Sequence, residues 1–344
     1  MKAAVIHAAR DLRIEEAAPP ASLGAREVKL RIRNGGICGS DLHYYQDGGF
    51  GTVRIREPMI PGHEMAGEVA EIGAEVTRVR PGDKVVVDPS LPCGYCRYCR
   101  EGKPRHCLDM RFFGSAMRFP HVQGGFRELL VCTEAQAVPV PADLPLEKAA
   151  FAEPLAVCLH AAVQAGPLLG QRVLVTGAGP IGALCVMVAR YAGAGEVVAT
   201  DIAEAPLAMV RRLGADQALD TRADPAALER FGADKGWFDA VFECSGNGAA
   251  LSGAIGAARP GATLVQVGLG VETPLPINAL VAKELNLRGT FRFDQEFAWA
   301  VRCIASGAID VAPLLTEVVP LAEAVRAFDL AGDRSRAMKV QLAL

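Results

Sequence analysis

The sequence predicts an α/β protein of two domains, a β-rich domain followed by a doubly wound parallel sheet. The first observation is length, because 344 residues exceed the size at which a single hydrophobic core is usual. The second is a series of short β-type runs, punctuated by Gly, Pro and Asp, over the first 150 residues. The third is the alternation of apolar strands with alanine-rich helical stretches from Gln171 onward, which is typical of a parallel sheet with crossover helices.

Composition and charge favour a globular protein that acts on a small molecule. Hydrophobic residues make up 51% and charged residues 22%, and the formal net charge of −3 gives no basic pattern for binding nucleic acid. The first apolar run is broken by His7, Arg10 and Asp11, so it lacks the core of a signal peptide. The longest uncharged run, residues 173–189, carries a Gly/Pro cluster that indicates a strand, a turn and a helix rather than a membrane span. We therefore expect a cytoplasmic protein without a membrane partner.

The β-rich domain contains four clear strand patterns, EVKLRIRNG, GEVAEIG, DKVVVDP and FRELLVC, which predict an irregular barrel or sandwich. Two of its segments carry chemistry: GGICGSDLHYY holds Cys38, Ser40, Asp41 and His43, and PGHEMAGEV holds His63 and Glu64. A thiolate, an imidazole and a carboxylate are the mixed ligands of a catalytic zinc site with an open position. By spacing alone, Cys38 fits a small buried hydrophobe and His63 a hydrogen-bonded core histidine equally well.

Four cysteines in the stretch LPCGYCRYCREGKPRHC predict a second metal site. Their spacing is C-x2-C-x2-C-x7-C, and they are Cys93, Cys96, Cys99 and Cys107. Four thiolates on one loop form a closed tetrahedral zinc site, which stiffens the loop and leaves no position for substrate. Ten cysteines are too sparse for a disulfide scaffold of this length, and the residues between these four leave no apolar face for buried thiols. An iron–sulfur cluster stays open as an alternative, because ferredoxins also use two-residue spacings.

The second domain begins with a dinucleotide-binding signature. A glycine-rich turn follows the apolar strand RVLVT and opens a helix; it reads Gly177, Ala178, Gly179, Pro180, Ile181, Gly182. The glycines permit a tight turn and a close approach of a pyrophosphate to the helix N-terminus. Asp201 ends the next strand, where an acid binds the adenosine ribose hydroxyls. A chance glycine turn with a strand-end acid is the alternative, and the strand–turn–helix context disfavours it.

Asp201 also predicts which dinucleotide binds. A carboxylate at this position repels the 2′-phosphate of NADP, and no Arg or Lys follows before Arg211. NAD is therefore favoured over NADP.

The rest of the chain continues the strand alternation and ends in a tail of mixed character. Further strands are predicted at DAVFECSG, TLVQVGLG and NLRGTF. The segments AWAVRCIASGAI and LAEAVRAFDLAG have helical spacing, and AMKVQLAL is a final apolar strand. Periodicity alone leaves open which domain this tail joins.

Taken together, these motifs resemble one known family. CGSDLHYY, PGHEMAGEV, the four-cysteine loop, FAEPLAVCLHA and GAGPIG, in that order and separation, closely resemble the zinc-dependent medium-chain dehydrogenase/reductase family from end to end. Within it, the chain resembles the polyol branch, which includes sorbitol dehydrogenases. The stretches GGICGSDLHYYQ, DMRFFGSAMRFPHV, FAEPLAVCLHAA and GDRSRAMKVQLAL carry a closer match, to members that oxidise a sugar acid.

The resemblance implies a domain organisation and an assembly. It implies a GroES-like catalytic domain at residues 1–155, with a structural zinc lobe at about residues 90–110, and a Rossmann NAD-binding domain at residues 156–295. It also implies that residues 296–344 return to the catalytic domain. Members of the family commonly form homodimers or homotetramers.

The resemblance further implies roles for individual residues. Cys38, His63 and Glu64 match the catalytic zinc ligands, and Glu153 matches an acid that either ligates the metal or holds its water. Ser40 and His43 match a proton relay, in which a hydroxyl takes the substrate proton and passes it outward by way of the cofactor ribose and an imidazole.

Several further residues are expected on the substrate side. Phe291, Arg292 and Phe293 match a segment that closes this side, and Arg292 is expected to bind substrate hydroxyls or a carboxylate. Substrate contacts are also expected of Tyr44, Arg111 and Arg118. One departure from the polyol branch is Pro206, which stands where a basic residue often contacts the adenosine.

The expected activity is the NAD-dependent, zinc-dependent oxidation of a secondary alcohol, and the resemblance implies the C5 hydroxyl of L-idonate as the reacting group and 5-keto-D-gluconate as product. A sorbitol- or xylitol-type polyol dehydrogenase is the main alternative, and a threonine dehydrogenase is a more distant one. A non-catalytic zinc and nucleotide sensor and a zinc-free quinone-type reductase are disfavoured, because neither needs an open metal site with a proton relay.

Overall fold

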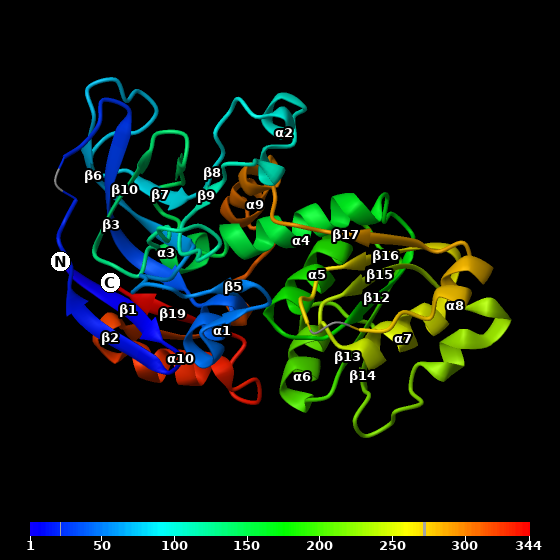
Figure 1. Cartoon of the computed structure of the whole chain (residues 1–344). Coiled ribbons are helices and arrows are strands. Elements are labelled where there is room, and N and C mark those ends of the chain that lie inside the picture. Colours follow the sequence, from blue (N-terminus) through cyan, green and yellow to red (C-terminus); the bar gives the residue numbers. More distant parts are fainter. Residues whose placement is uncertain (21, 271–272) are drawn as a thin grey trace. The chain divides into compact units, whose positions relative to one another are not determined.

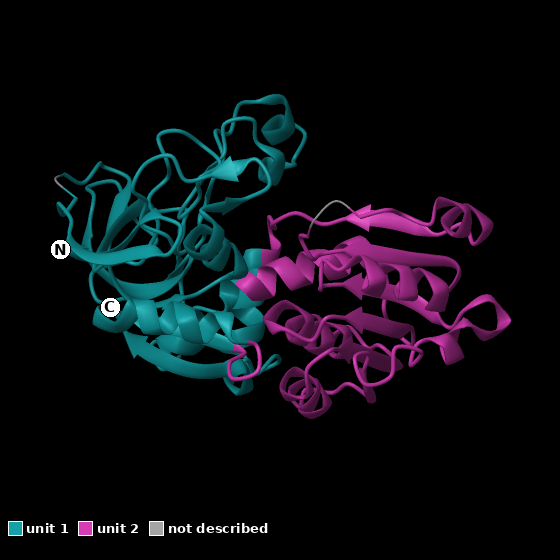
Figure 2. Ribbon diagram, turned by 60° about the horizontal axis from the view of Figure 1, so that its bottom comes forward, with its two compact units in different colours: residues 1–153, 297–333, 339–344 teal, residues 154–296, 334–338 magenta. Residues whose placement is uncertain are grey.

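The computed structural model describes residues 1–20, 22–270 and 273–344 (Figure 1). Its internal contacts divide the chain into two compact units, which Figure 2 shows in different colours. Unit 1 comprises residues 1–153, 297–333 and 339–344, and unit 2 comprises residues 154–296 and 334–338.

Unit 1 is built on a mixed sheet of seven strands. In sheet order they are β11 (Ala137–Pro139), β7 (Lys84–Val87), β6 (Glu64–Ile72), β3 (Glu27–Gly36), β19 (Lys339–Ala343) and β18 (Leu315–Pro320), and β10 (Leu129–Thr133) also pairs with β3. All neighbours are antiparallel except β18 and β19. Because side chains alternate along a strand, Val28, Leu30 and Ile32 of β3 all enter one core cluster. The last strand of the chain thus lies directly beside β3.

Smaller elements complete unit 1. The N-terminal run that lacks a signal-peptide core forms a hairpin of β1 (Lys2–Ala8) and β2 (Asp11–Glu16). The other strands are β4 (Gly49–Phe50), β5 (Val53–Arg54), β8 (Ser90–Leu91) and β9 (Arg111–Phe112). The helices are α1 (Gly39–Asp47), α2 (Arg97–Arg100), α3 (Leu146–Ala149), most of α9 (Glu296–Ala305), α10 (Ala324–Gly332) and the 3₁₀ turns η1 (Pro104–His106), η3 (Ala312–Leu314) and η4 (Leu321–Glu323).

Unit 2 is a six-stranded, fully parallel sheet with helices between its strands. In sheet order the strands are β14 (Gln217–Asp220), β13 (Glu196–Asp201), β12 (Arg172–Thr176), β15 (Phe238–Glu243), β16 (Ala258–Gln266) and β17 (Asn286–Gly289). Counted along the chain, this is the order 3-2-1-4-5-6 of a Rossmann fold. The helices are α4 (Ala152–Ala165, from Pro154 onward), α5 (Pro180–Tyr191), α6 (Glu204–Arg212), α7 (Gly248–Ala257), α8 (Ile277–Ala282) and the 3₁₀ segment η2 (Glu229–Lys235).

The core of unit 2 explains why its strands are nearly continuous apolar runs. Leu174, Val198, Val241 and Leu264 come from four neighbouring strands, and all four are fully buried in one cluster. A parallel sheet covered on both faces needs such runs. The predicted α/β fold class is therefore confirmed. No helix among the described residues is long and apolar enough to span a membrane.

Candidate active site

The start of α1 brings the first candidate ligand to its neighbours. Cys38 is the N-cap residue of α1, and its backbone N–H donates to Asp41 Oδ2 at 3.0 Å. The other oxygen of Asp41 accepts from the backbone N–H of Gly62 at 3.2 Å. Asp41 is fully buried, so it ties the helix start firmly to the loop that precedes β6. Sequence reasoning noted Asp41 but gave it no role.

Three predicted ligands meet at this point. One ligand atom each of Cys38, His63 and Glu64 lie within 4.8 Å of one another, and the latter two residues are buried. This spacing suits one zinc ion, whose bonds to sulfur, nitrogen and oxygen are about 2.0–2.3 Å long. Burial lowers the pKa of His63, but the negative charges of Asp41 and Cys38 outweigh burial and raise that pKa well above its ordinary value. The cluster therefore attracts a cation, and the donor set fits zinc.

Glu153 lies beside this cluster. It is buried near the start of α4 and does not belong to the group of mutually close ligand atoms. Burial raises the pKa of its carboxyl group to about 7, against the opposing positive charge of His63. This placement keeps open both expected roles of Glu153, direct ligation and the holding of a metal-bound water.

Lys339 is a buried residue beside the candidate ligands that the sequence analysis did not single out. Its Nζ lies 2.5 Å from the carboxylate of Glu64 and donates to the backbone oxygen of Ile37 at 3.1 Å. Burial lowers the pKa of Lys339, but the negative charges of Glu64 and Cys38 raise it overall. The only signal in the sequence is one charged residue inside the apolar strand AMKVQLAL. Lys339 holds the carboxylate of a candidate metal ligand.

The expected proton-relay residues follow Cys38 on α1. Ser40 is half-buried in the first turn, and His43 is exposed one turn later. Residues three apart lie on the same face of a helix. His43 Nδ1 lies 3.4 Å from Asp47 Oδ2, which orients the ring. Their part in proton transfer stays a prediction.

Tyr44 is deeply buried rather than open. Its side chain is 2% exposed, and its ring packs against Phe50 with centroids 5.5 Å apart. Its hydroxyl oxygen accepts a hydrogen bond from the backbone N–H of Ala116 at 3.1 Å. These contacts position the segment around Ala116, and direct contact between Tyr44 and substrate stays a prediction.

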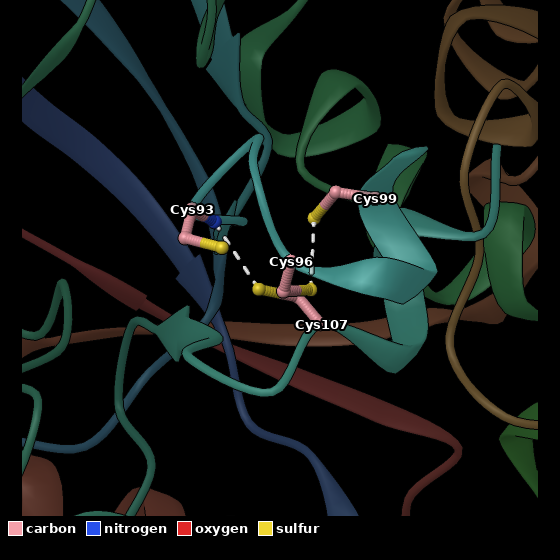
Figure 3. Close-up of side chains that lie close together, drawn as sticks. All are labelled: Cys93, Cys96, Cys99 and Cys107. Atoms are coloured by element: carbon pink, nitrogen blue, oxygen red, sulfur yellow. Dashed lines mark hydrogen bonds between the residues drawn. The ribbon is translucent and has the colours of Figure 1, made fainter. Parts of the chain in front are cut away.

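The four lobe cysteines converge on one point, as Figure 3 shows. The sulfur atoms of Cys93, Cys96, Cys99 and Cys107 all lie within 4.8 Å of one another. The Cys96 and Cys99 sulfurs are 3.6 Å apart, close to the roughly 3.8 Å expected for two thiolates on one tetrahedral zinc. Backbone N–H groups of Cys93 and Asp109 donate to Cys107 Sγ at 3.2 and 3.3 Å. Backbone N–H groups of Cys99 and Leu108 lower the pKa of Cys96 to about 6, which favours a thiolate.

In unit 2, a different structural reason explains why glycine occupies each of three positions in the dinucleotide signature. Gly177 has a φ of +83°, and a Cβ there would lie 2.8 Å from the backbone nitrogen of Ser245. A Cβ on Gly182 would lie 1.7 Å from the backbone oxygen of Gly177, so the helix could not pack as closely. A Cβ on Gly179, the N-cap of α5, would meet nothing within 4 Å. Gly179 therefore faces open space at a helix N-terminus, where a pyrophosphate can approach the backbone.

Asp201 ends β13 beside this loop. Its Oδ2 accepts from the backbone N–H of Ala178 at 2.7 Å, and its Oδ1 accepts from those of Ile202 and Ala203 at 2.7 and 3.1 Å. The next basic side chain, Arg211, forms an ion pair with Glu204 at 2.5 Å. Arg211 is thus held on α6, which agrees with the predicted preference for NAD.

Glu243 is a second residue that sequence reasoning missed. It is fully buried at the end of β15, and its carboxylate accepts from Thr176 Oγ1, from the backbone N–H groups of Ser245 and Gly246, and from Gln266 Nε2. These donors come from the carboxyl ends of three neighbouring strands. Glu243 therefore organises the edge of the sheet at which dinucleotides bind in this fold.

The three expected substrate-side arginines differ in their surroundings. Arg292 is half-buried, has a φ of +53°, and stacks its guanidinium 4.8 Å from the Phe291 ring centroid. Arg111 is exposed on β9. Arg118 pairs with Asp109 and donates to the backbone oxygens of Met110 and Leu108 at 2.8 and 3.1 Å. The guanidinium of Arg118 thus holds the lobe itself, and its contact with substrate stays a prediction.

Comparison with known proteins identifies the family. Residues 24–142 match the model of the alcohol dehydrogenase GroES-like domain, and residues 180–306 match that of the zinc-binding dehydrogenases. The L-idonate 5-dehydrogenase (NAD(P)(+)) of Escherichia coli K12 is 44% identical over 314 residues, which are 91% of this chain and 90% of that protein. This chain belongs to the zinc-dependent medium-chain dehydrogenase/reductase family.

Two further comparisons place the chain within the zinc-dependent medium-chain family. The crystal structure of L-idonate 5-dehydrogenase from Escherichia coli K-12 superimposes with a TM-score of 0.96 and 40% identity, covering 100% of this chain and 98% of that one. The sorbitol dehydrogenase of Bacillus subtilis is 33% identical over 335 residues, covering 96% of this chain and 93% of that protein. The predicted membership is confirmed, and the chain is a zinc-binding oxidoreductase.

Proposed function

We propose that this chain catalyses the NAD-dependent oxidation of the C5 hydroxyl of L-idonate, giving 5-keto-D-gluconate. The observation that carries the proposal is its likeness to the L-idonate 5-dehydrogenase of Escherichia coli, with 44% identity in sequence and a TM-score of 0.96. The Bacillus subtilis sorbitol dehydrogenase is less similar, at 33% identity. The reaction converts one alcohol and one NAD⁺ into one ketone, one NADH and one proton.

We assign Cys38, His63 and Glu64 as the protein ligands of the catalytic zinc, with Glu153 beside them as a ligand or as the holder of a water. Their mutual closeness supports this assignment. When bound, zinc supplies a Lewis acid that lowers the pKa of the substrate hydroxyl. Asp41 fixes the backbone of Cys38, and Lys339 fixes the carboxylate of Glu64, so both ligands are held before metal arrives.

Ser40 and His43 carry the substrate proton away. Ser40, two residues after Cys38, takes the proton from the substrate hydroxyl. The exposed imidazole of His43, oriented by Asp47, releases it to solvent. Bound NAD⁺ supplies the hydride acceptor, so the protein mainly positions the reactants.

The dinucleotide binds at Gly177, Gly179, Pro180, Ile181 and Gly182, with its adenosine ribose on Asp201. The open space at Gly179 and the carboxylate at the end of β13 support this placement. The four lobe cysteines hold a second, structural zinc.

Arg292 binds the carboxylate of the sugar acid. Its half-buried guanidinium is stacked on Phe291, and a left-handed backbone at a non-glycine residue is a strained conformation that often marks a functional position. A planar guanidinium suits bidentate recognition of a carboxylate.

A homodimer or homotetramer in the cytoplasm completes the proposal. Strand β17 is the edge of the parallel sheet, and all four of its residues are exposed. An exposed edge strand is a template for pairing with a second copy of the chain. The ten cysteines form no disulfide bond with one another, which is compatible with a reducing compartment.

The decisive experiment compares substrates with the purified, zinc-loaded protein. NADH formation is measured with L-idonate, D-gluconate, sorbitol, xylitol and L-threonine, and NADP replaces NAD in a parallel series. A clear preference for L-idonate with NAD supports the proposal. A preference for sorbitol or xylitol leaves the zinc and hydride chemistry intact but refutes the sugar-acid assignment. Tight NADH binding without turnover of any substrate favours a nucleotide sensor.

A further inference from the structure

Three cysteines gather in unit 2, outside both zinc clusters and outside the proposed mechanism. They are Cys158 of α4, Cys185 of α5 and Cys244, which directly follows β15. The sulfur of Cys244 lies 3.8 Å from that of Cys185. The thiol of Cys158 donates to the backbone oxygen of Ile181 at 3.5 Å.

This thiol cluster, defined by these three residues, underlies the dinucleotide loop. The backbone N–H of Cys244 donates to the backbone oxygen of Thr176 at 2.8 Å, directly before Gly177. The next residue, Ser245, packs so closely on Gly177 that a Cβ there would lie 2.8 Å from the Ser245 nitrogen. A displacement of Cys244 therefore moves the support of the loop that approaches the pyrophosphate.

Access to the two close thiols is unequal. Cys185 is fully buried, whereas Cys244 is partly exposed at the carboxyl end of β15, the edge at which ligands bind in this fold. A small oxidant thus reaches Cys244 first, and Cys185 lies behind it as the resolving thiol. Hydrogen bonding from Cys158 and Cys244 lowers the pKa of Cys185, which favours its attack as a thiolate. The hydrogen bond that Cys244 donates to Cys185 raises the pKa of Cys244.

We propose that Cys185 and Cys244 form a redox-sensitive dithiol that controls dinucleotide binding. A hydroperoxide oxidises Cys244: the O–O bond breaks, an S–O bond forms, and water, or an alcohol from an organic hydroperoxide, leaves with the thiol proton. The sulfur of Cys185 then attacks Cys244, the S–O bond breaks, the S–S bond forms, and the hydroxide leaves as water. The two thiols lose two electrons, and the hydroperoxide gains them.

Disulfide formation must shift the segment behind the loop. A disulfide bond is about 2.05 Å long, so the two sulfurs approach each other by about 1.8 Å. Because Cys244 and Ser245 support Gly177, the oxidised protein binds the dinucleotide more weakly. Bound dinucleotide lies over this edge of the sheet and slows the oxidation. The proposal rests on dinucleotide binding by unit 2 and is independent of which alcohol is the substrate.

The test measures NADH binding, because oxidation of Cys38 would abolish turnover for an unrelated reason. The zinc-loaded protein is treated with hydrogen peroxide, NADH affinity is measured by fluorescence titration, and disulfides are mapped by mass spectrometry of non-reduced peptides. We expect a peptide linked through Cys185 and Cys244. We also expect a rise in the NADH dissociation constant of at least about fivefold, the lower end of usual coupling between sites, that a dithiol reverses.

Two variants and one further measurement on the unaltered protein complete the test. In Cys244→Ser, compared with its own reduced form, peroxide leaves NADH affinity unchanged, whereas Cys303→Ser, which alters a buried thiol outside the cluster, keeps the response. In the unaltered protein, saturating NADH slows formation of the linked peptide. The proposal is refuted if the linked peptide never forms, if Cys244→Ser still loses affinity, or if NADH gives no protection.

Discussion

Lys339 and Glu64 form a buried ion pair between residues 275 positions apart in the sequence, with Nζ 2.5 Å from the carboxylate. Their side chains are 4% and 1% exposed, so water screens neither charge. The pair joins the last strand of the chain to the first residue of β6. Lys339 thereby orients Glu64, a candidate zinc ligand. Residues that contact metal ligands without touching the metal orient those ligands in other metalloproteins in the same way.

The first prediction concerns this pair. Lys339→Met leaves the carboxylate of Glu64 buried without a counter-ion, and removal of one partner of a buried pair costs about 3–5 kcal/mol of unfolding free energy. The matched control is Lys148→Met, which breaks the exposed pair with Asp310 at 3.2 Å and should cost no more than about 1 kcal/mol. Urea unfolding of both variants measures the difference. If the two variants lost the same unfolding free energy, the buried pair would stabilise the fold no more than the exposed pair.

The second prediction separates metal chemistry from cofactor binding. Cys38→Ser and His63→Ala should abolish turnover, because each removes a proposed ligand of the catalytic zinc. Both variants should still bind NADH, since the dinucleotide residues all lie in unit 2. Steady-state kinetics and NADH titration give the two readouts, with Cys132→Ser, a buried thiol remote from the ligands in sequence, as control. NAD-dependent activity that survives either change would overturn the ligand assignment.

The third prediction concerns the lobe. Cys99→Ala should reduce the zinc content by one ion per chain and lower the thermal midpoint, because three ligands hold a structural zinc poorly. Metal analysis by mass spectrometry and a thermal melt measure both effects. A coloured protein that contains iron would instead identify the lobe as an iron–sulfur site.

The fourth prediction concerns cofactor choice. Asp201→Ala removes the carboxylate that we propose binds the adenosine ribose and repels a 2′-phosphate, so kcat/KM should fall for NAD and rise for NADP. The ratio between the two should change by at least about tenfold, which corresponds to roughly 1.4 kcal/mol. Glu204→Ala removes the ion-pair partner of Arg211 on α6, and its ratio of kcat/KM for NAD and NADP is compared with that of Asp201→Ala. An unchanged ratio in Asp201→Ala would show that another group selects the cofactor.

The fifth prediction concerns acid stability. Burial raises the pKa of Asp239, but hydrogen bonds from Arg172 and Arg259 outweigh it and lower this pKa to about 2. Because the folded-state pKa lies below the ordinary value of 3.8, the carboxylate stabilises the fold above about pH 4 and loses that contribution as the pH falls towards 2. The contribution is about 2 kcal/mol by linkage.

Urea unfolding at about pH 5 and about pH 3 checks this. The stability gap between the unaltered protein and Asp239→Asn should be narrower at about pH 3 than at about pH 5. A gap for Asp239→Asn that does not depend on pH would refute the assignment.

The parts of the molecule that sequence reasoning predicted are those encoded within one segment. The spacing of Cys93, Cys96 and Cys99 brings their thiols together over one short loop, and the strand–glycine–helix pattern around Gly177 needs no distant partner. The alternation of strands and helices likewise predicted the parallel sheet. The strands without such a signal include β14, which is half-buried throughout, and β18, which pairs only with β19 among the described residues.

The parts that were missed depend on residues far apart in the sequence. Lys339 meets Glu64 only because β19 lies beside β3, and Glu243 collects donors from the ends of three strands. Arg118, an expected substrate contact, pairs with Asp109, and this pairing follows from the turn of the lobe and not from the residue type. Local sequence patterns therefore predict sets of candidate ligands. The charged residues that pair with those ligands are brought to them only by the tertiary structure.

Because β19 lies between β3 and β18, the sheet of unit 1 can be completed only late in the synthesis of the chain. The last strand of the parallel sheet of unit 2 ends at Gly289. All strands of that sheet are therefore synthesised before β19, the strand that pairs with β3. Domains fold as units during synthesis, N-terminal parts generally first, and here a later part of the chain is finished before the earlier one. Lys339, which pairs with the candidate zinc ligand Glu64, is synthesised later than this sheet. A chain interrupted after Gly289 therefore contains every strand of the parallel sheet but lacks Lys339, the ion-pair partner of Glu64.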